Sequence, residues 1–472
     1  MLPKQIVSTL DEVLNDSCMK AHLPGMALIM SQNGQPIFEK YYGYRDIENK
    51  LPVNGDTVFG VASITKSLTA LAVMQLEDAG KLSVDDQLIL WLPELKMPNR
   101  YYQKKIKIHH LLSHTSGLPG LNTINCARAN SILNDPHGEY LSDRLSLLEN
   151  EKRIKTVKEL MEVMSETEYS LLGPPGAMFN YSNESYALLQ EIIERSSGEG
   201  FIPYVQKNIL QPLGMNSSFF LTSDLKKLEN VTELYAYRRE LDNKPSVFHS
   251  PAWWDVGGIY SNGSLKTSSS DLMKYLEVFR LDGTVKGERI VSKASIQKMT
   301  SAQVTMPTGE RYGYGLKVDC LSGTNIFGHG GSIKGVSSHM KVAKEQGITV
   351  SVLINIAEAD PEKLAMTSLN HGLQLPDVTD RKFTKYKISA EQLNDFSGVY
   401  QSDEGHKVEI VLADNGIKMK GQNNLLPMIP YSVDSFMTTG GERVKIMTDD
   451  VGKVIGLFKG VRFIPKTLSG ME

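Results

Sequence analysis

The chain has 472 residues, of which 41% are hydrophobic and 22% are charged, and its formal net charge is −3. This length is sufficient for two or three domains with substantial cores. The nearly balanced charge, without a local run of Lys or Arg, argues against nucleic acid or an anionic membrane as a partner.

The three cysteines, Cys18, Cys126 and Cys320, are far apart and form no Cys-x-x-Cys pair. The sequence therefore predicts neither a zinc site nor a disulfide framework, and we expect no metal and no cofactor. Residues 1–5 lack the apolar core of a signal peptide. No stretch approaches the ~18 apolar residues of a membrane span. These observations indicate a cytoplasmic protein with free thiols.

Hydrophobic periodicity and turn residues predict the elements of the first part of the chain. Apolar positions three and four residues apart indicate helices, and short apolar or alternating runs indicate strands. Asn33-Gly34 is a strong hairpin signal, and Gly80 and Gly198 are positioned to end helices. The predicted elements, in chain order, are a helix over 4–20, strands over 26–31 and 36–42, a helix from Ser63 to Gly80, a helix over 184–197, strands over 313–318, 337–342 and 348–353, and a helix over 362–373.

Two further segments differ in composition from these elements. Residues 121–170 are polar, charged and helical in character, without a strong core stripe after Leu121, and we interpret them as a surface insertion that could act as a lid. Residues 377–386 are typical of a linker. Beyond them, short strands separated by turns predict a small β-barrel or sandwich over 387–472. We therefore predict an α+β fold in which both ends of residues 1–376 supply one antiparallel sheet, followed by an all-β domain.

One candidate nucleophile stands at the start of the predicted buried helix. In Ser63-Ile64-Thr65-Lys66 the hydroxyl and the amine lie on the same helix face. A partly desolvated lysine has a lowered pKa and could accept the proton of the serine. A capping serine beside a solvated lysine is the alternative. Four other Ser-x-x-Lys tetrads begin at Ser17, Ser223, Ser295 and Ser338.

A candidate proton shuttle and a substrate-binding amide precede the next predicted helix. Tyr181 could pass a proton to a leaving group, and Asn183 could hold a substrate amide. Alternatively, Ser182 or Asn183 caps the helix. Tyr260-Ser261-Asn262 repeats the tripeptide, but it follows Gly257-Gly258 in a Gly/Ser-rich stretch, so we favour Tyr181.

A run of small residues, Phe327-Gly328-His329-Gly330-Gly331-Ser332, lies between strand-like segments. Small residues let a backbone pair closely with a bound substrate and direct N–H groups at it. A phosphate-binding loop is disfavoured because no Gly-Lys-Ser/Thr ending follows. A tight turn with a surface histidine is the simpler alternative.

Other histidines and aromatic residues are less informative. His109 and His110 are adjacent, so on a strand they point to opposite faces, and no carboxylate completes a metal site with His114. We expect a structural role for these histidines. Tyr312 and Tyr314 fit a substrate groove or the core equally well.

Taken in order, the three segments resemble the serine β-lactamase and penicillin-binding protein superfamily. The resemblance is closest to class C β-lactamases and their esterase and D-aminopeptidase relatives, and it covers about residues 5–370. Supporting phrases lie at 111–119, at 212–215, and at Gly257-Gly258 followed by 270–272.

This resemblance implies a β-lactamase/transpeptidase-like α/β sandwich and a role for each candidate residue. It implies that Ser63 is the acylated nucleophile, Lys66 its base and Tyr181 the shuttle to the leaving group. It further implies that Asn183 contacts the acyl side of the substrate and that the backbone N–H groups of Ser63 and Ser332 form the oxyanion hole. The substrate-binding set is Asn183, His329, Gly330, Gly331 and Ser332.

The third segment departs from the usual pattern of the family. Where the family usually carries Lys-Thr-Gly, whose lysine helps to bind the carboxylate of penicillins, this chain has His329-Gly330-Gly331. A histidine with an unperturbed pKa near ~6.5 is mostly neutral at pH 7, which weakens the case for β-lactamase or carboxypeptidase action. His-x-Gly resembles the version in D-aminopeptidases and in related peptidases with a C-terminal β-barrel, which can flank or gate the site.

The sequence therefore predicts a metal-free serine hydrolase that forms an acyl-enzyme with peptides containing D-residues or with other small amides. A carboxylesterase, a transacylase or a weak β-lactamase is the alternative within the hydrolases. A catalytically silent penicillin-binding or sensor protein is the alternative from another class. The expected partner is a small molecule or short peptide, and a homo-oligomer is compatible with the sequence.

Overall fold

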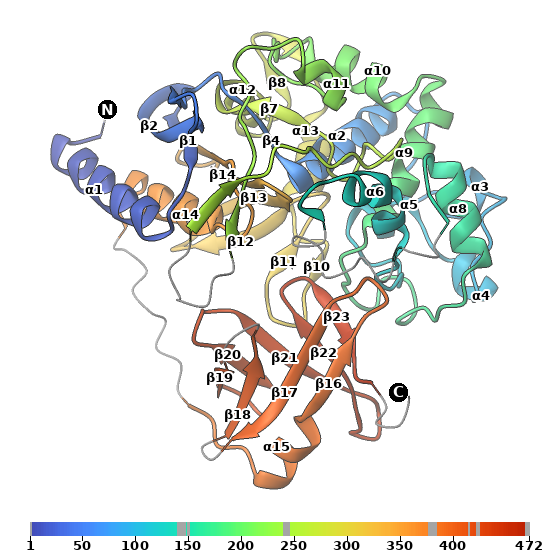
Figure 1. The fold of residues 1–472 in the computed structure, drawn as a ribbon. Coiled ribbons are helices and arrows are strands. Elements are labelled where there is room, and N and C mark those ends of the chain that lie inside the picture. The colour runs from blue at the N-terminus through green and yellow to red at the C-terminus, as the bar shows by residue number, and fades with distance from the viewer. Residues whose placement is uncertain are drawn as a thin grey trace.

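A nine-stranded antiparallel sheet forms the centre of the larger part of the molecule (Figure 1). The computed structural model describes residues 2–138, 148, 152–238, 246–375, 385–413, 416–421 and 425–467. The strand order is β10-β11-β12-β13-β14-β15-β1-β2-β3, so β1 lies between β2 and β15, with Met26 opposite Ile354. This confirms the predicted sheet built from both ends of the segment.

The strands of this sheet are β1 (Gly25–Gln32), β2 (Gln35–Asp46), β3 (Leu51–Pro52), β10 (Val304–Thr305), β11 (Arg311–Tyr312), β12 (Lys317–Leu321), β13 (Thr324–Ile333), β14 (Val336–Ala343) and β15 (Ile348–Ile354). The predicted strand over 313–318 is misplaced, because β11 ends at Tyr312 and β12 begins at Lys317. Gly315 interrupts the strand with a φ of 70°, and a Cβ there would lie 2.9 Å from the carbonyl oxygen of Lys66. The chain therefore turns here to approach a helix closely.

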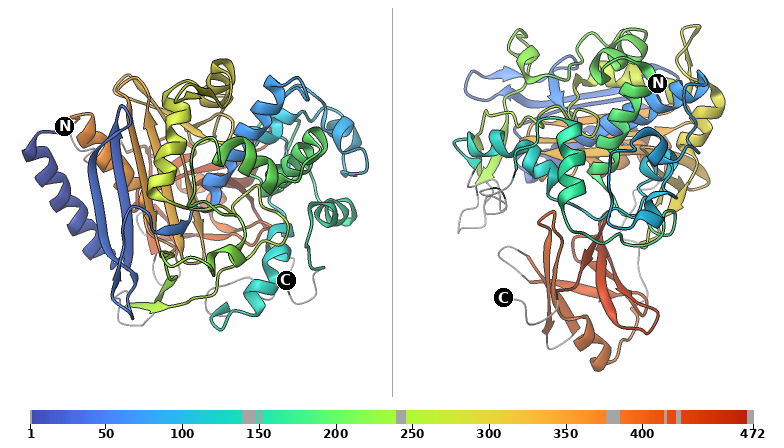
Figure 2. Two further views of the ribbon diagram at one scale, coloured as in Figure 1. Left: turned by 90° about the horizontal axis from the view of Figure 1, so that it is seen from above. Right: turned by 90° about the vertical axis from the view of Figure 1, so that its right-hand side faces the viewer.

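Helices cover both faces of the sheet, as the view from above shows (Figure 2). One face carries α1 (Lys4–Lys20) and α14 (Pro361–Gly372), and the other faces α12 (Ser269–Arg280) and the helical region. That region contains α2 (Thr65–Asp78), α3 (Leu88–Trp91), α4 (Arg100–Gln103), α5 (Ile108–Leu112), α6 (Thr123–Leu133), α8 (Val157–Glu166), α9 (Asn183–Ser197), α10 (Phe201–Val205), α11 (Thr222–Leu225) and α13 (Lys293–Thr300). Short strand pairs are β4 (Val58–Gly60) with β7 (Lys266–Ser268), β5 (Tyr235–Arg238) with β6 (Ser246–His249), and β8 (Thr284–Val285) with β9 (Glu288–Arg289).

Local sequence signals account for several element ends. Asn33 and Gly34 both have positive φ, 51° and 77°, as the tight hairpin between β1 and β2 requires. Helix α9 begins after Ser182, whose hydroxyl accepts the N–H of Ser185 at 3.0 Å, and it ends at Gly198 in the left-handed region. The predicted helix-capping role of Ser182 is confirmed.

The predicted surface insertion belongs partly to the main core. Helix α8 buries Val157, Leu160, Met161 and Met164, which are spaced as one helical stripe, and α6 buries Ile124 and Ile132. These side chains join the same hydrophobic cluster as α2 and α9. The expectation that residues 121–170 lack a core stripe is therefore wrong for their described part.

The C-terminal part is an eight-stranded antiparallel sheet in sequential order, preceded by α15 (Ala390–Phe396). A bridge between Tyr400 and Lys466 brings its two ends together, so the barrel is nearly closed, as predicted (Figure 1). Of the predicted linker, residues 377–384 lie outside the described residues, and the domain boundaries stay a prediction. The strands are β16 (Gly398–Gln401), β17 (Lys407–Ala413), β18 (Gly416–Lys420), β19 (Leu425–Pro430), β20 (Ser435–Thr438), β21 (Arg443–Thr448), β22 (Val454–Lys459) and β23 (Arg462–Pro465).

A small hydrophobic cluster joins the two parts of the molecule. It contains Phe179, Tyr181, Met306 and Tyr312 from the larger part and Phe458 from the barrel, all buried. One end of the barrel therefore packs against the loop that carries Tyr181. None of the described helices is both long and apolar enough to cross a lipid bilayer.

Candidate active site

Ser63 lies at the junction between a short strand and the buried helix α2. The residue before it, Ala62, has a φ of 45°, which is unfavourable for a side chain with a Cβ. Lys66, one turn later, is completely buried. Its amine lies 3.3 Å from the Ser63 hydroxyl, 2.9 Å from Asn183 Oδ1 and 2.7 Å from the carbonyl oxygen of Asn262. The solvated-lysine alternative is therefore wrong.

Burial strongly favours the neutral amine of Lys66. Desolvation holds the pKa of Lys66 well below its usual value, and the positive charges of Arg462 and Arg128 act in the same direction. The carboxylates of Glu404 and Glu184 oppose this shift. A neutral amine beside a serine hydroxyl can accept its proton.

The phenol of Tyr181 lies beside Lys66. Its side chain is 7% exposed, and the Lys66 amine lies 4.8 Å from the centre of its ring. The hydroxyl lacks a hydrogen-bond partner of good geometry among the described residues. Burial raises the pKa of Tyr181, while the neighbouring Ser63 hydroxyl and the Arg462 guanidinium act in the opposite direction. The three predicted groups therefore face one another.

His114 holds the loop that carries this phenol. The ring of His114 lies 4.2 Å from that of Tyr181, centre to centre, and its Nδ1 accepts the N–H of Ser182 at 3.1 Å. Burial, and then the nearby Lys66, hold the pKa of His114 well below its usual value, so the ring is neutral. His114 therefore has the expected structural role, and it contacts the site directly. Its spacing in the sequence did not indicate this contact.

The small-residue segment forms the second half of β13 and approaches Ser63. A Cβ on Gly331 would lie 2.2 Å from the carbonyl oxygen of Val61 and 2.8 Å from the Ser63 nitrogen, so only glycine fits. Gly330 is less confined, because the atom nearest to its Cβ would be Nδ1 of the His339 side chain, at 2.8 Å. Ser332, by contrast, is exposed at the open edge of the strand.

His329 points away from the surface. It is buried, and its Nε2 lies 3.0 Å from the hydroxyl of Tyr312. Burial, and then the charge of Lys66, lower the pKa of His329 to about 3. The surface-histidine alternative is therefore wrong. Tyr312 lies beside the site, whereas Tyr314 packs in the main core.

The second tripeptide also reaches the site, although not through its tyrosine. The carbonyl oxygen of Asn262 accepts a hydrogen bond from Lys66, whereas Tyr260 packs against the main core. The backbone N–H of Tyr260 donates to Gln190 on α9 at 2.8 Å. This segment therefore supplies a main-chain acceptor for the lysine.

Two charged side chains from the barrel complete the surroundings. The guanidinium of Arg462 donates to both carboxylate oxygens of Glu404, at 2.5 and 2.9 Å, and lies 5.1 Å from the centre of the Tyr181 ring. The amide of Asn183 donates to Glu404 at 3.4 Å. Neither residue is predicted from the sequence, because an isolated Glu in a turn and an isolated Arg at the start of a strand carry no local signal of a site.

A second buried carboxyl lies at the start of α9. Glu184 accepts hydrogen bonds from the hydroxyls of Thr123, at 2.7 Å, and Ser182, at 3.1 Å. Burial, and then the charge of Glu404, raise the pKa of Glu184 to about 7. This group supports the loop before α9 and contributes charge near Lys66.

A buried ion pair fixes the end of β13. Lys334 lies 3.1 Å from Asp135 and donates to the carbonyl oxygen of Ser250 at 2.6 Å. The side chains of this pair are almost completely buried, 2% and 0% exposed. The strand that passes Ser63 is thereby tied to the segment around Ser250.

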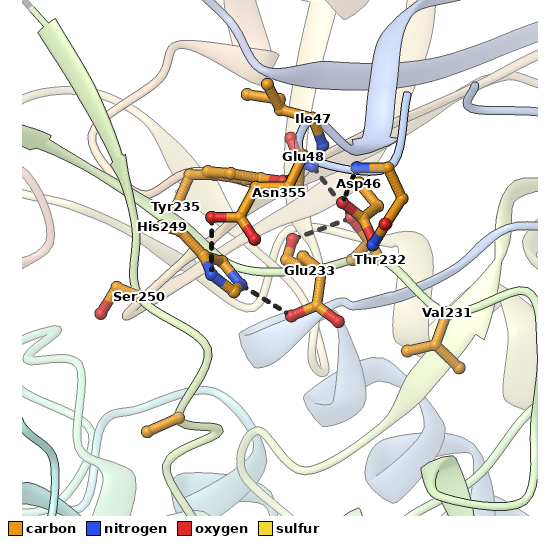
Figure 3. Close-up of polar contacts among 12 residues, drawn as sticks. Asp46, Ile47, Glu48, Val231, Thr232, Glu233, Tyr235, His249, Ser250 and Asn355 are labelled. Carbon is orange, nitrogen blue, oxygen red and sulfur yellow. Dashed lines mark hydrogen bonds and ion pairs between the residues drawn. The ribbon is translucent and has the colours of Figure 1, made fainter. Parts of the chain in front are cut away.

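The segment around Ser250 is held by a cluster of polar side chains next to it (Figure 3). His249 Nε2 lies 2.9 Å from Glu233, and its Nδ1 lies 3.7 Å from Glu48. Nearby, the amide of Asn355 donates to the hydroxyl of Thr232 at 2.9 Å. These contacts join the β2–β3 connection to the end of β6 and to the residues just before β5.

Comparisons with known proteins found a matching family profile, related sequences and a similar structure. A sequence profile for the family described as Beta-lactamase matches residues 5–372. Penicillin-binding protein 4* from Bacillus subtilis (strain 168) is 26% identical over 446 residues, covering 91% of this chain and 90% of that protein. Protein flp from Staphylococcus aureus (strain N315) is 26% identical over 351 residues, or 74% of this chain, and the match spans 62% of the length of flp. The structure of the octameric penicillin-binding protein homologue from Pyrococcus abyssi superposes with a TM-score of 0.70 at 27% identity, covering 98% of this chain and 100% of that one.

Proposed function

Because the chain belongs to the beta-lactamase family of serine hydrolases, we propose that it hydrolyses small amides, foremost peptides containing D-residues, through an acyl-enzyme on Ser63. The observation that carries the proposal is the fully buried amine of Lys66, 3.3 Å from the Ser63 hydroxyl. A lysine in this environment has no structural need to face a serine, and its neutral form is a base.

The reaction then proceeds in two steps. The Ser63 oxygen bonds to the carbonyl carbon of the substrate while its proton passes to Lys66, and the C–N bond breaks as Tyr181 delivers a proton to the leaving nitrogen. Water then attacks the acyl carbon while its proton passes to Tyr181. The bond to the Ser63 oxygen breaks, and this oxygen takes back the proton held by Lys66. The N–H groups of Ser63 and Ser332 stabilise the oxyanion in both steps.

The surroundings of His329 support an amide without a neighbouring carboxylate, rather than a penicillin, as the preferred substrate. With a pKa of about 3, His329 is neutral in the working range, and its Nε2 is engaged by Tyr312. It therefore offers no positive charge to a penicillin carboxylate. A neutral His329 ring is compatible with a substrate that has no carboxylate next to the scissile bond.

An ester substrate is the second candidate, because the same nucleophile and oxyanion donors serve both bonds. An ester needs less help from a proton shuttle, since an alkoxide is a better leaving group than an amide anion. The buried phenol of Tyr181 therefore favours the amide.

The test is a panel of D-aminoacyl p-nitroanilides, p-nitrophenyl esters and benzylpenicillin, assayed with the native protein, Ser63→Ala and the exposed control Ser223→Ala. We expect turnover of the anilides exceeding that of benzylpenicillin, lost in Ser63→Ala and retained in Ser223→Ala. Ester turnover without anilide turnover would overturn the amidase assignment. No turnover of any substrate would favour a silent sensor protein.

A further inference from the structure

The barrel contributes an ion pair that contacts the catalytic groups themselves. Glu404 lies in the turn between β16 and β17, and Arg462 begins β23. Their two charge-assisted hydrogen bonds are buried at the junction of the two parts, where Arg462 lies against the Tyr181 ring and Glu404 accepts from Asn183. Such a bidentate pair holds both side chains in one geometry.

We propose that Glu404 and Arg462 are positioning residues for the reaction at Ser63, through which docking of the barrel sets the orientation of Asn183 and the charge state of Lys66. The proposal rests on the proposed function, because it concerns the proton transfer from Ser63. Neither residue touches the reacting atoms in this arrangement.

The geometry at Asn183 supports an orienting role. Its Oδ1 accepts from Lys66 at 2.9 Å, and its Nδ2 donates to Glu404 at 3.4 Å. With a carboxylate on one side and the lysine on the other, the amide has a single favourable orientation, because the flipped amide would direct its oxygen at the carboxylate. Glu404 therefore keeps the acceptor of Asn183 on the lysine.

The contacts of Glu404 show why it stays in place. The Arg462 guanidinium donates to both carboxylate oxygens of Glu404, and His406 Nε2 lies 3.5 Å from Glu404 Oε2. A Cβ on Gly120 would lie 2.6 Å from Glu404 Oε2, so the loop before α6 packs directly on the carboxylate. The backbone carbonyl oxygen of Glu404 accepts a hydrogen bond from the side-chain amide of Asn125 on α6 at 3.3 Å. The carboxylate is thus held by both parts of the molecule.

The charges of the pair act on Lys66 with opposite signs. Arg462 disfavours the protonated amine and Glu404 favours it. The other charged or titratable groups around Lys66 are Arg128 on α6, Glu184 and Tyr186 on α9, Tyr181 and His114 in the preceding loops, and His329 on β13. The substitutions leave these residues in place, although Glu404 also raises the pKa of Glu184 and Arg462 also lowers the pKa values of Tyr181 and His114.

The experiment measures the rate of Ser63 labelling by a fluorophosphonate against pH for the native protein, Arg462→Gln, Glu404→Gln and the double variant. The rate rises with pH as Lys66 loses its proton, and the midpoint of this rise follows its pKa. We expect Arg462→Gln to move the midpoint to higher pH and Glu404→Gln to lower pH, each by roughly half a unit to one and a half units. The double variant should return towards the native midpoint.

A matched control separates this effect from a general loosening of the barrel. Arg443 makes another contact between the two parts, donating to the carbonyl oxygen of Thr308 at 3.0 Å and lying 3.7 Å from Glu310. Arg443→Gln should leave the midpoint unchanged. The folded fraction of each variant is measured at every pH and the labelling rate is divided by it, so that partial unfolding does not mimic the shift.

The outcomes distinguish the two proposals. Labelling of Ser63 with coincident midpoints in all five proteins would overturn the positioning role and leave the hydrolase intact. Shifts of the same sign in both single variants would also overturn it. No labelling of the native protein would overturn the proposed function itself.

Discussion

The carbonyl oxygen of Val461, at the tip of the β22–β23 hairpin, accepts the backbone N–H of Tyr181 at 3.0 Å. In the same hairpin, the N–H of Phe463 donates to the side chain of Asn180 at 2.9 Å. The loop that carries the candidate proton shuttle is therefore held by main-chain contacts with the barrel. The candidate catalytic residues belong to the larger part, and the barrel contacts the loop that carries one of them.

Phe458 offers a direct test of this dependence. Its side chain is completely buried in the cluster shared with Phe179 and Tyr181. Phe458→Ala should destabilise the protein by about 3–5 kcal/mol, as truncation of a buried aromatic residue does, and should lower kcat per folded molecule. Urea unfolding and active-site titration give the two values.

Phe436→Ala is the matched control, because Phe436 is equally buried but lies in the core of the barrel itself. It should cost similar stability while leaving kcat per folded molecule near the native value. Equal losses of kcat in the two variants would contradict a specific role of the shared cluster.

His329→Gln tests the protonation state of the residue that stands where the family usually has a lysine. Since the pKa of His329 is lowered to about 3, the ring is neutral between pH 5 and 8. Glutamine can keep a hydrogen bond to Tyr312, so the shape of the kcat/KM profile in this range should not change. A limb with a midpoint near 6 to 7 that disappears in the variant would contradict this assignment.

Glu184→Gln tests the buried carboxyl at the start of α9. Folding raises the pKa of Glu184 from 4.5 to about 7, so the native state binds this proton more tightly than the unfolded state does. The stability contribution of this residue is therefore most favourable below pH 4.5 and is lost as the pH rises towards 7. Glutamine stays neutral throughout.

The stability of Glu184→Gln relative to the native protein should accordingly increase between pH 5 and pH 8, by on the order of 2–3 kcal/mol. Urea unfolding at the two pH values provides the measurement. A difference that is the same at both would show that the carboxyl titrates normally in the folded protein.

Turns and helix ends could be predicted from the sequence, because they depend on the residues at those positions. The Asn33-Gly34 hairpin, the Ser182 cap and the glycine end of α9 follow from conformational preferences of single residues. The core stripe of α8 was visible in the spacing of Val157 and Leu160, but the high charge of the surrounding segment obscured it. The displaced strand near Gly315 depends on a close approach to α2 that no local pattern reveals.

The same distinction applies to the site. Ser63, Lys66 and Tyr181 were recognisable because each lies in a short motif, and their order along the chain is informative. Glu404 and Arg462 lie more than 200 residues from Asn183 in sequence, as their numbering shows, and reach it only when the barrel docks. A charge in a hairpin turn looks like ordinary solvated surface until the partner surface is known.

The arrangement of Ser63 beside a neutral Lys66 is tested most directly by intact-protein mass spectrometry after treatment with a fluorophosphonate. We predict a single adduct that peptide mapping assigns to Ser63, absent in Ser63→Ala, retained in Ser223→Ala, and formed at least about a hundredfold more slowly in Lys66→Ala. An unmodified native protein, or an adduct on a different serine, would contradict the account.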